Sequence, residues 1–325
     1  MRILVTGAGG FLGADLVEEL RMAGHQVRRL VSKASTVNDD DGNVIVGDIR
    51  DASCVSSAMT GCDCVVHLAG KAHALDDEGV SEADYQSVNV EGTRRLLEKA
   101  KAGGVRKFVF ASSVKVFGET TLGCVDEAAP AVPRSPYARS KWSAEQLVAS
   151  FASGALTTVS FRLPLVYGPT EKGNLFRMIA AIDRGRFPPL PHVAALRSML
   201  HVKNFGLAVR AALEVDAFPR PMYVIADAAP YSITGIYDHL REGLGRRPPV
   251  CRVPGWALSF GAKCGDLLQA LTRRPFPFSS STREKLMGQA CYSPDAAMRE
   301  LHYRPLYTFE QAVPDLITHY RRSLA

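Results

Sequence analysis

The chain has 325 residues, of which 46% are hydrophobic and 22% are charged, and its formal net charge is +6. This length and composition are those of a soluble globular protein with room for one α/β domain and an additional lobe, and they exclude extensive disorder. The charge is small and the cations are scattered along the chain, which argues against nucleic acid as a partner and suits an anionic small ligand.

The seven cysteines have irregular spacing, and a single C-x-C pair has no second pair to complete a zinc site. We therefore expect reduced thiols, a cytoplasmic location and no metal. The apolar run in MRILVTGAGG breaks at Gly7, so no signal peptide is predicted. Residues 253–271 come nearest to a membrane span, but Lys263 and Asp266 interrupt them. We expect this segment to pack on its own domain, with attachment to a membrane surface as the alternative.

The first 165 residues alternate short apolar runs with helical patterns. Apolar runs without polar alternation are typical of parallel strands that are buried on both faces. Their alternation with helices predicts an α/β fold with a doubly wound parallel sheet of the Rossmann type. Strands are expected at 2–6, 26–31, 44–48, 64–70, 107–113 and 157–163, and helices at 12–24 and 89–104.

Beyond about residue 165 the regular alternation stops, and prolines gather at 186–192 and 246–255. One more helix (204–215) and strand (222–227) are expected to return to the sheet. The rest predicts a smaller C-terminal lobe over the carboxyl edge of the sheet. The predicted division is a dinucleotide-binding domain of residues 1–165 with 200–227 and a substrate-binding lobe of residues 166–199 with 228–325.

The segment ILVTGAGGFLG follows the first expected strand and opens the first helix. Glycines at such a turn let backbone N–H groups approach a pyrophosphate closely, at the N-terminus of a helix. In this position the glycine pattern predicts a dinucleotide-binding loop. The loop residues expected to contact the cofactor are Gly7, Gly10, Phe11, Leu12 and Gly13.

The end of the second strand indicates which dinucleotide is bound. An acidic residue about 20 positions after the glycines would bind the adenosine ribose and favour NAD. Here Ser32 and Lys33 follow the strand, and the first acid is Asp39. Arg29 and Lys33 can face a 2′-phosphate, or both can be solvated surface cations. NADP is therefore favoured as cofactor, with NAD possible.

The segment SPYARSKWSAEQ places Tyr137 and Lys141 four residues apart, on one face of an expected helix. The composition alone gives about one chance in three of such a pair somewhere in the chain. The pair by itself therefore leaves two interpretations open, a solvated helix surface or a phenol held beside an ammonium for proton transfer.

Seven motifs occur in the order and spacing of extended short-chain dehydrogenases/reductases that modify nucleotide sugars. The chain resembles the NAD-dependent epimerase/dehydratase branch of that superfamily, closely over residues 1 to about 215 and loosely beyond. The resemblance implies a homodimer and a nucleotide-sugar substrate, and no nucleic acid. The motifs are TGAGGFLG, GDIRD, VVHLAG, SVNVEGT, VFASSVKVFGE, SPYARSK and FRLPLVYGP.

The resemblance also implies the catalytic roles. Tyr137 would exchange the proton of a sugar hydroxyl or carbonyl while hydride passes to or from nicotinamide C4. Lys141 would lower the pKa of that phenol and hold the nicotinamide ribose, and Ser113 would hydrogen-bond the reacting oxygen. The implied cofactor contacts are Asp48 and Ile49 at the adenine ring, and Leu68, Ala69 and Gly70 at the ribose and phosphates.

Three further residues are expected to contact the substrate. Asn174 and Arg197 match positions that hold the diphosphate, for which a guanidinium fork is well suited. Lys115 lies two residues after Ser113, so a strand's period of two would return it to the same side, facing the sugar. The alternative for Lys115 is that the strand has already ended and the side chain reaches solvent.

Two departures from the family narrow the reaction. Val114 and Lys115 stand where the 4,6-dehydratases carry an Asp-Glu pair, so elimination of water is not expected, and Leu165 replaces an Asn of many members. The segment SSVKVFGE resembles reductase-like enzymes that make 6-deoxy-N-acetylhexosamine precursors of bacterial surface polysaccharide. We therefore favour a 4-ketoreductase on a UDP-linked 4-keto-6-deoxy (N-acetyl)hexose. The alternative is a UDP-hexose 4-epimerase with tightly bound NAD, and a non-catalytic cofactor sensor is disfavoured by the intact triad.

Overall fold

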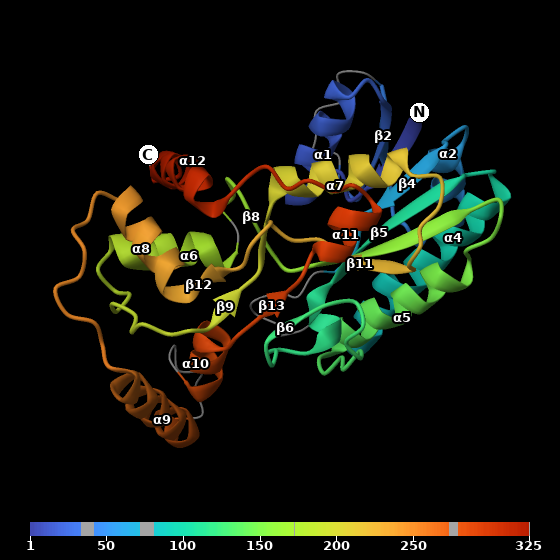
Figure 1. The fold of residues 1–325 in the computed structure, drawn as a ribbon. Helices are drawn as coiled ribbons and strands as arrows, with labels where there is room; N and C mark the ends of the chain where they lie inside the picture. The colour runs from blue at the N-terminus through green and yellow to red at the C-terminus, as the bar shows by residue number, and fades with distance from the viewer. Residues whose placement is uncertain (34–41, 72–80, 172, 273–278, 325) are drawn as a thin grey trace.

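The centre of the computed structural model is a seven-stranded parallel sheet in the order β11-β7-β5-β4-β1-β2-β3 (Figure 1). The strand order reverses between β1 and β4, which is where open α/β sheets bind ligands. The predicted doubly wound fold is confirmed. The strands are β1 (Arg2–Thr6), β2 (Gln26–Val31), β3 (Val44–Val46), β4 (Cys64–His67), β5 (Lys107–Ser113), β7 (Thr157–Leu163) and β11 (Met222–Val224). The structure describes residues 1–33, 42–71, 81–171, 173–272 and 279–324.

Helices cover both faces of this sheet, because its strands are apolar on both sides. In β1, Ile3 and Val5 face one helical layer and Leu4 faces the other, as the period of two requires. The first layer is α1 (Phe11–Met22), α7 (Val202–Glu214) and α11 (Asp295–Glu300), and the second is α2 (Ala52–Met59), α4 (Gly92–Ala102) and α5 (Pro136–Ser150).

Some expected boundaries differ from those of the structure. β4 stops at His67, whereas the sequence predicted a strand to residue 70, because the N–H of Ala69 donates to the Thr6 hydroxyl (3.1 Å) and leaves the ladder. The helix expected at 89–104 begins as the π-helix η2 (Gln86–Glu91), which continues into α4. Single-turn π-helices occur frequently at functional sites, which directs attention to this segment.

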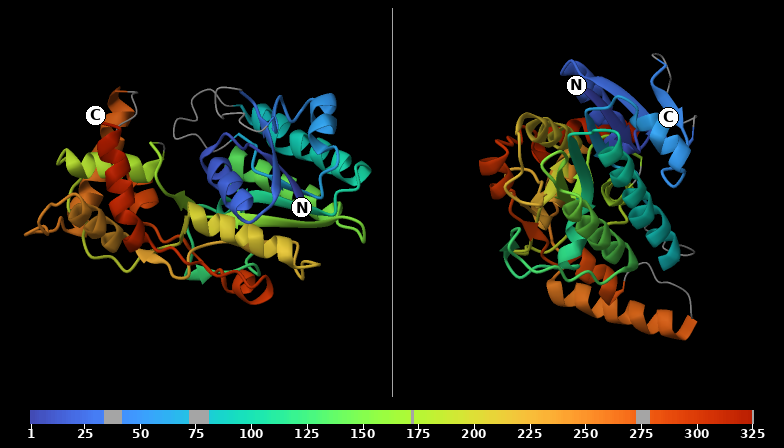
Figure 2. Two further views of the ribbon diagram at one scale, coloured as in Figure 1. Left: turned by 90° about the horizontal axis from the view of Figure 1, so that it is seen from above. Right: turned by 90° about the vertical axis from the view of Figure 1, so that its right-hand side faces the viewer.

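A second hydrophobic core lies at one end of the sheet, among α6, α8 and α12 (Figures 1 and 2). It supports the predicted smaller lobe, although Ala296 and Tyr303 of the C-terminal part belong to the core of the sheet instead. The remaining elements are α3 (Glu82–Tyr85), η3 (Val114–Phe117), β6 (Cys124–Val125), β8 (Leu165–Tyr167), α6 (Asn174–Asp183), β9 (Leu196–Arg197), β10 (Met199–His201), β12 (Tyr231–Ser232), α8 (Ile233–Gly243), α9 (Gly255–Thr272), α10 (Ser280–Met287), β13 (Cys291–Tyr292) and α12 (Phe309–Arg322).

The structure corrects the expectation that all cysteines are reduced. Cys124 and Cys291 form a disulfide, and their Cα atoms are 4.4 Å apart. The two residues are direct partners in the parallel pairing of β6 with β13, across a sequence separation of 167 residues. Spacing along the chain cannot reveal such a pair, because only the fold brings these two short strands together.

A buried ion pair fixes α5 to the sheet. The Glu145 carboxylate accepts hydrogen bonds from the guanidinium of Arg162 on β7, with an Arg162 Nη2 to Glu145 Oε2 distance of 2.7 Å. The Ser112 hydroxyl of β5 donates to the same carboxylate. The Arg162 guanidinium also lies over the Phe117 ring at 4.3 Å. Both charged side chains are at most 4% exposed. Burying either charge alone would be costly, and each side chain compensates the charge of the other.

We predict that Glu145→Gln destabilises the fold by about 3 kcal/mol, because it leaves the Arg162 charge buried without a counter-charge. Denaturant-induced unfolding of the variant and the wild type measures this difference. Glu82→Gln is the matched control, since Glu82 pairs with Arg139 at 2.9 Å but both side chains are exposed. Exposed pairs contribute below about 1 kcal/mol. Equal losses in the two variants would contradict the prediction.

Candidate active site

The glycine loop between β1 and α1 leaves space for a ligand to approach the backbone. Gly7 has φ +69°, and a Cβ added there would lie 2.7 Å from the backbone nitrogen of Ala69. A Cβ at Gly13 would lie 2.7 Å from the Cα of Ala8. α1 begins after Gly10, which offers no side chain to cap the helix, so its first N–H groups are open to an anion. These residues fit the pyrophosphate of a dinucleotide.

A cavity of about 310 Å³ opens at the carboxyl ends of β1, β4, β5 and β7, with α5 along one side. It brings together most of the residues predicted for cofactor and catalysis. The predicted residues that line it are Gly7, Gly10, Phe11, Leu12, Gly13, Leu68, Gly70, Ser113, Tyr137 and Lys141.

The pair predicted to be catalytic, Tyr137 and Lys141, lies in the first turns of α5. Ser135 caps this helix by accepting a hydrogen bond from the N–H of Ala138 (3.1 Å), and Pro136 occupies the first turn, where no N–H is needed. Tyr137, Lys141 and Glu145 then follow at intervals of four residues and share one helix face. The third member anchors the helix to the sheet, which leaves the first two at the cavity.

Tyr137 and Ser113 are hydrogen-bonded across the cavity floor. Lys141 is buried, and its ammonium donates to the carbonyl oxygen of Ala111 (2.8 Å) and lies over the Phe110 ring at 4.6 Å. Gly70 borders the same ammonium, since a Cβ there would be 3.6 Å from Lys141 Nζ. The end of β4, the end of β5 and α5 therefore meet at one point.

Burial shifts the pKa values of Lys141 and Tyr137. It lowers the pKa of Lys141 to about 8, and the nearby Glu145 carboxylate raises that pKa by a smaller amount. Burial also raises the pKa of Tyr137, and the hydrogen bond with Ser113 opposes that rise only in part. The predicted lowering of the phenol's pKa by Lys141 stays a prediction, since burial is the dominant effect on Tyr137 in the chain alone.

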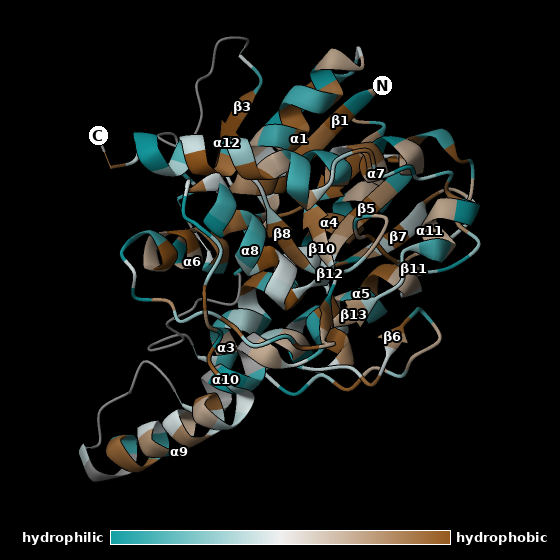
Figure 3. Cartoon of the chain, turned by 60° about the vertical axis from the view of Figure 1, so that its left-hand side comes forward, coloured by the Kyte–Doolittle hydropathy of each residue, from teal (hydrophilic) through white to brown (hydrophobic). Residues whose placement is uncertain are grey.

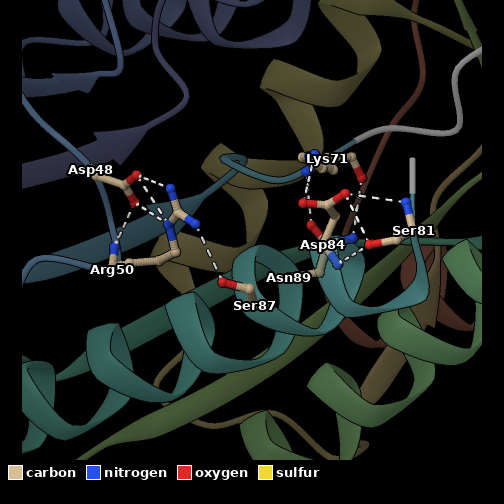
Figure 4. Close-up of polar contacts among 7 residues, drawn as sticks. All are labelled: Asp48, Arg50, Lys71, Ser81, Asp84, Ser87 and Asn89. Atoms are coloured by element: carbon tan, nitrogen blue, oxygen red, sulfur yellow. Dashed lines mark hydrogen bonds and ion pairs between the residues drawn. The ribbon is translucent and has the colours of Figure 1, made fainter. Parts of the chain in front are cut away.

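Asn89 is a site residue whose role the sequence did not predict. Its side chain is 1% exposed, accepts from the N–H of Lys71 (2.7 Å) and donates to the Ser140 hydroxyl of α5 (3.0 Å). Figure 4 shows Asn89 of η2 beside Lys71. Asn89 therefore joins the segment after β4 to the catalytic helix. The signal was present in the motif SVNVEGT, but only the fold gives it a partner.

Several predicted cofactor residues lie outside the cavity lining. Asp48 is paired with Arg50 (2.6 Å), which lowers the pKa of its carboxyl (Figure 4). Ile49 is buried in the core beneath α4. Ala69 packs against Gly7. Ser32 and Lys33 follow β2 and are exposed. Asp39 lies outside the described residues. Arg29 is buried, on the sheet face that carries Val27 and Val31. The adenine and 2′-phosphate contacts stay predictions.

The predicted substrate residues are spread over the lobe side of the site. Lys115 is in η3, not in a strand, and its ammonium is paired with Glu119. Asn174 begins α6 and lines a second, smaller cavity, which shares Val166 with the first. Arg197 donates to the carbonyl oxygen of Gly288 (3.0 Å). The three residues do not line a common cavity, and their substrate contacts stay predictions.

Three comparisons with known proteins agree with this geometry. The family model described as "NAD dependent epimerase/dehydratase family" matches residues 3–226. The chain belongs to this family. Its members form the extended short-chain dehydrogenase/reductase type, so the protein is an enzyme. Nowhere in the described part of the chain do three or more His, Cys, Asp or Glu side chains gather as they would around a metal.

Relatives of this epimerase/dehydratase family member span most of its length. It is 30% identical over 295 residues to a UDP-glucose 4-epimerase of Vibrio cholerae, covering 87% of this chain and 89% of the relative. It is 28% identical over 281 residues to an N-acetyl-alpha-D-glucosaminyl-diphospho-ditrans,octacis-undecaprenol 4-epimerase of Escherichia coli O157:H7, covering 86% and 83%. The solved structure of MoeE5 in complex with UDP-glucuronic acid and NAD matches with 26% identity, TM-score 0.75 and coverage of 99% and 100%.

The arrangement is suited to proton exchange at a secondary alcohol or ketone. A nicotinamide cofactor, when bound, supplies or accepts the hydride. The Tyr137 phenol is placed to give or take the proton at the substrate oxygen, and Ser113 is placed to hold that oxygen by a hydrogen bond. Lys141 lines the same cavity as Tyr137. Its two predicted roles, to stabilise a phenolate at Tyr137 and to hold a ribose, stay predictions.

We predict that Tyr137→Phe lowers kcat at least a hundredfold, because it removes the proton donor, while cofactor affinity stays within a factor of two or so, because the glycine loop is unchanged. Steady-state turnover and a cofactor titration by fluorescence measure the two quantities. Tyr307→Phe, which removes a hydroxyl from a ring away from the cavity, is the control. Undiminished turnover in Tyr137→Phe would sink the assignment.

We also predict that kcat/KM for ketone reduction falls as the pH rises through about 8. Burial lowers the pKa of Lys141, so the free enzyme loses this ammonium above pH 8 and retains it below. The pH profile of kcat/KM from neutral to alkaline values measures the limb. In Lys141→Arg the charge persists, and the falling limb should move to higher pH. A flat wild-type profile across this range would contradict the prediction.

Proposed function

We propose that the chain is a 4-ketoreductase, which reduces the 4-keto group of a UDP-linked 4-keto-6-deoxyhexose or its N-acetylamino counterpart. One observation argues against dehydration and leaves hydride transfer at the ketone as the reaction, while the cofactor preference described below favours the reductase. The cavity offers Tyr137 as a proton donor, but the residues directly after Ser113 offer no acid–base pair for elimination. Val114 is buried, and the carboxylate of nearby Glu119 is paired with Lys115. Proton donation to a ketone therefore suits the site better than dehydration.

The proposed reductant is NADPH. β2 ends at Val31, and the next two residues, Ser32 and Lys33, are exposed where an acid would select NAD. A cation at this place can form a charge-assisted hydrogen bond with a 2′-phosphate, worth about 1.5–3 kcal/mol. A reductase also needs an exchangeable cofactor, since each turnover consumes one hydride equivalent.

A 4-epimerase is the second candidate, because both sequence relatives described above carry that activity in their names. The two reactions use the same proton donor but treat the cofactor differently. An epimerase returns the hydride to the same sugar and has no net demand for reductant. Retention of cofactor and consumption of reductant therefore separate the candidates.

The test uses the purified full chain. We expect it to oxidise NADPH in proportion to added UDP-4-keto-6-deoxy-N-acetylglucosamine, with a 4-hydroxy sugar as product, and to release little cofactor on denaturation. Interconversion of UDP-glucose and UDP-galactose without added cofactor, together with NAD released on denaturation, would overturn the reductase and establish the epimerase.

Lys33→Glu tests the cofactor preference separately. It should raise the KM for NADPH roughly tenfold or more and leave that for NADH little changed, because only NADPH carries the 2′-phosphate. Lys101→Glu, the same charge change on an exposed position of α4, is the matched control. Equal effects of Lys33→Glu on both cofactors would remove Lys33 from the proposed site.

A further inference from the structure

Helix α9 projects from the rest of the molecule (Figure 1), and much of its ribbon has the colour of hydrophobic residues (Figure 3). Trp256 is 74% exposed and Phe260 is 66% exposed, four residues apart. Leu267 and Leu268 follow, at 62% and 43%. At helical spacing Trp256, Phe260 and Leu267 fall on one side. These three residues form the outer stripe of α9, and Leu268 borders it.

The opposite side of α9 packs on its own chain. Leu258 and Ala262 are buried, and the Asp266 carboxylate accepts a hydrogen bond from the N–H of Ser280 at the start of α10 (3.0 Å). The sequence-based expectation that this segment packs on its own domain therefore holds for only one side. Contiguous exposed apolar side chains are unusual on a protein surface and mark interaction sites, so the outer stripe is suited to a partner.

The charge around α9 identifies the chemistry of that partner. Residues 246–285 contain eight Lys or Arg and two Asp or Glu, a formal charge of +6 that equals that of the whole chain. The rest of the sequence has 31 charged residues of each sign. Cations occur throughout the chain, but acids balance them outside this segment, so the net charge of the sequence is concentrated here.

Two of these cations pair with acids of neighbouring helices. Arg252 pairs with Asp238 (2.7 Å), and the guanidinium of Arg246 contacts Asp183. Lys263 is exposed, three residues after Phe260 and four before Leu267, so it stands within the outer stripe. Its long stem can follow the apolar surface while the ammonium reaches an anionic group.

We propose that the outer stripe of α9 docks on an anionic membrane surface. Aromatic and aliphatic side chains bordered by Lys and Arg are typical of helices that lie in the bilayer interface, where anionic headgroups attract the cations. A second copy of the chain is disfavoured as the occupant, because two such segments, each of charge +6, would repel one another. Among the described residues, no helix meets the length and hydropathy needed to cross a bilayer, so α9 would lie on the surface.

This docking does not depend on the proposed reductase activity. None of the residues that line the cofactor cavity belongs to α9. Variants on the outer stripe should therefore leave turnover of a water-borne substrate unchanged. Because α9 and the cavity share no residues, the result of the membrane test does not depend on which reaction the site catalyses.

The test is co-sedimentation of the full chain with large vesicles. We expect binding to vesicles of phosphatidylglycerol with phosphatidylcholine, and loss of binding with phosphatidylcholine alone or at high ionic strength. The double variant Trp256→Ser/Phe260→Ser should lower the partition coefficient at least tenfold. Met22→Ser/Leu306→Ser is the matched control, since these side chains are 71% and 65% exposed on other parts of the surface.

Three results would overturn the proposal. One is absence of wild-type binding to the phosphatidylglycerol vesicles, and another is equal binding by the Trp256→Ser/Phe260→Ser variant. The third is a wild-type dimer in sedimentation velocity that this variant abolishes, which would assign the stripe to a second copy. Circular dichroism and retained turnover show that the variant is folded, and the dependence of wild-type binding on salt and lipid charge tests the proposal without any substitution.

Discussion

The site depends on the buried ion pair between Glu145 and Arg162. Two charges in an apolar interior are tolerated only when each compensates the other, so α5 can sit on the sheet in one position along its axis and in one rotation. Because Lys141 and Tyr137 precede Glu145 at intervals of four residues, that one contact also orients the ammonium and the phenol. A helix held by aliphatic packing alone would tolerate small shifts that proton transfer does not.

The same burial determines the proton chemistry. Lys141 is surrounded by a carbonyl oxygen and a phenyl ring, so its ammonium is less favoured than in water, and the Tyr137 phenolate is disfavoured as well. His67, between the Thr6 and Thr93 hydroxyls beneath the site, has its pKa lowered to about 3 by burial and stays neutral. His67 therefore adds no charge beneath the cavity, where the charged groups named above are Lys141 and the compensated pair of Glu145 and Arg162.

The substrate side is assembled differently from the cofactor side. The cofactor side comes from consecutive strand ends, whereas Arg197 lies against Gly288 and the disulfide joins Cys124 to Cys291. These contacts bridge short segments, part of which lie beyond the residues 3–226 that the family model matches. Short segments outside the sheet vary among relatives more readily than the elements they connect, so this part of the chain can differ while the fold is kept.

The sequence by itself determined the sheet, the glycine loop and the pairing of Tyr137 with Lys141 on one helix face. Each depends on residues close together in the chain: apolar runs of strand length, glycines at one turn, and Tyr137 four residues before Lys141. Tertiary structure alone decided what depends on distant residues, namely the pairing of Glu145 with Arg162, the role of Asn89 and the bond between Cys124 and Cys291. Local patterns record backbone conformation and burial, but they do not record which buried groups meet. The exposure of the outer stripe of α9 was likewise decided by the tertiary structure. Its apolar sequence pattern would be the same whether or not another segment covered it.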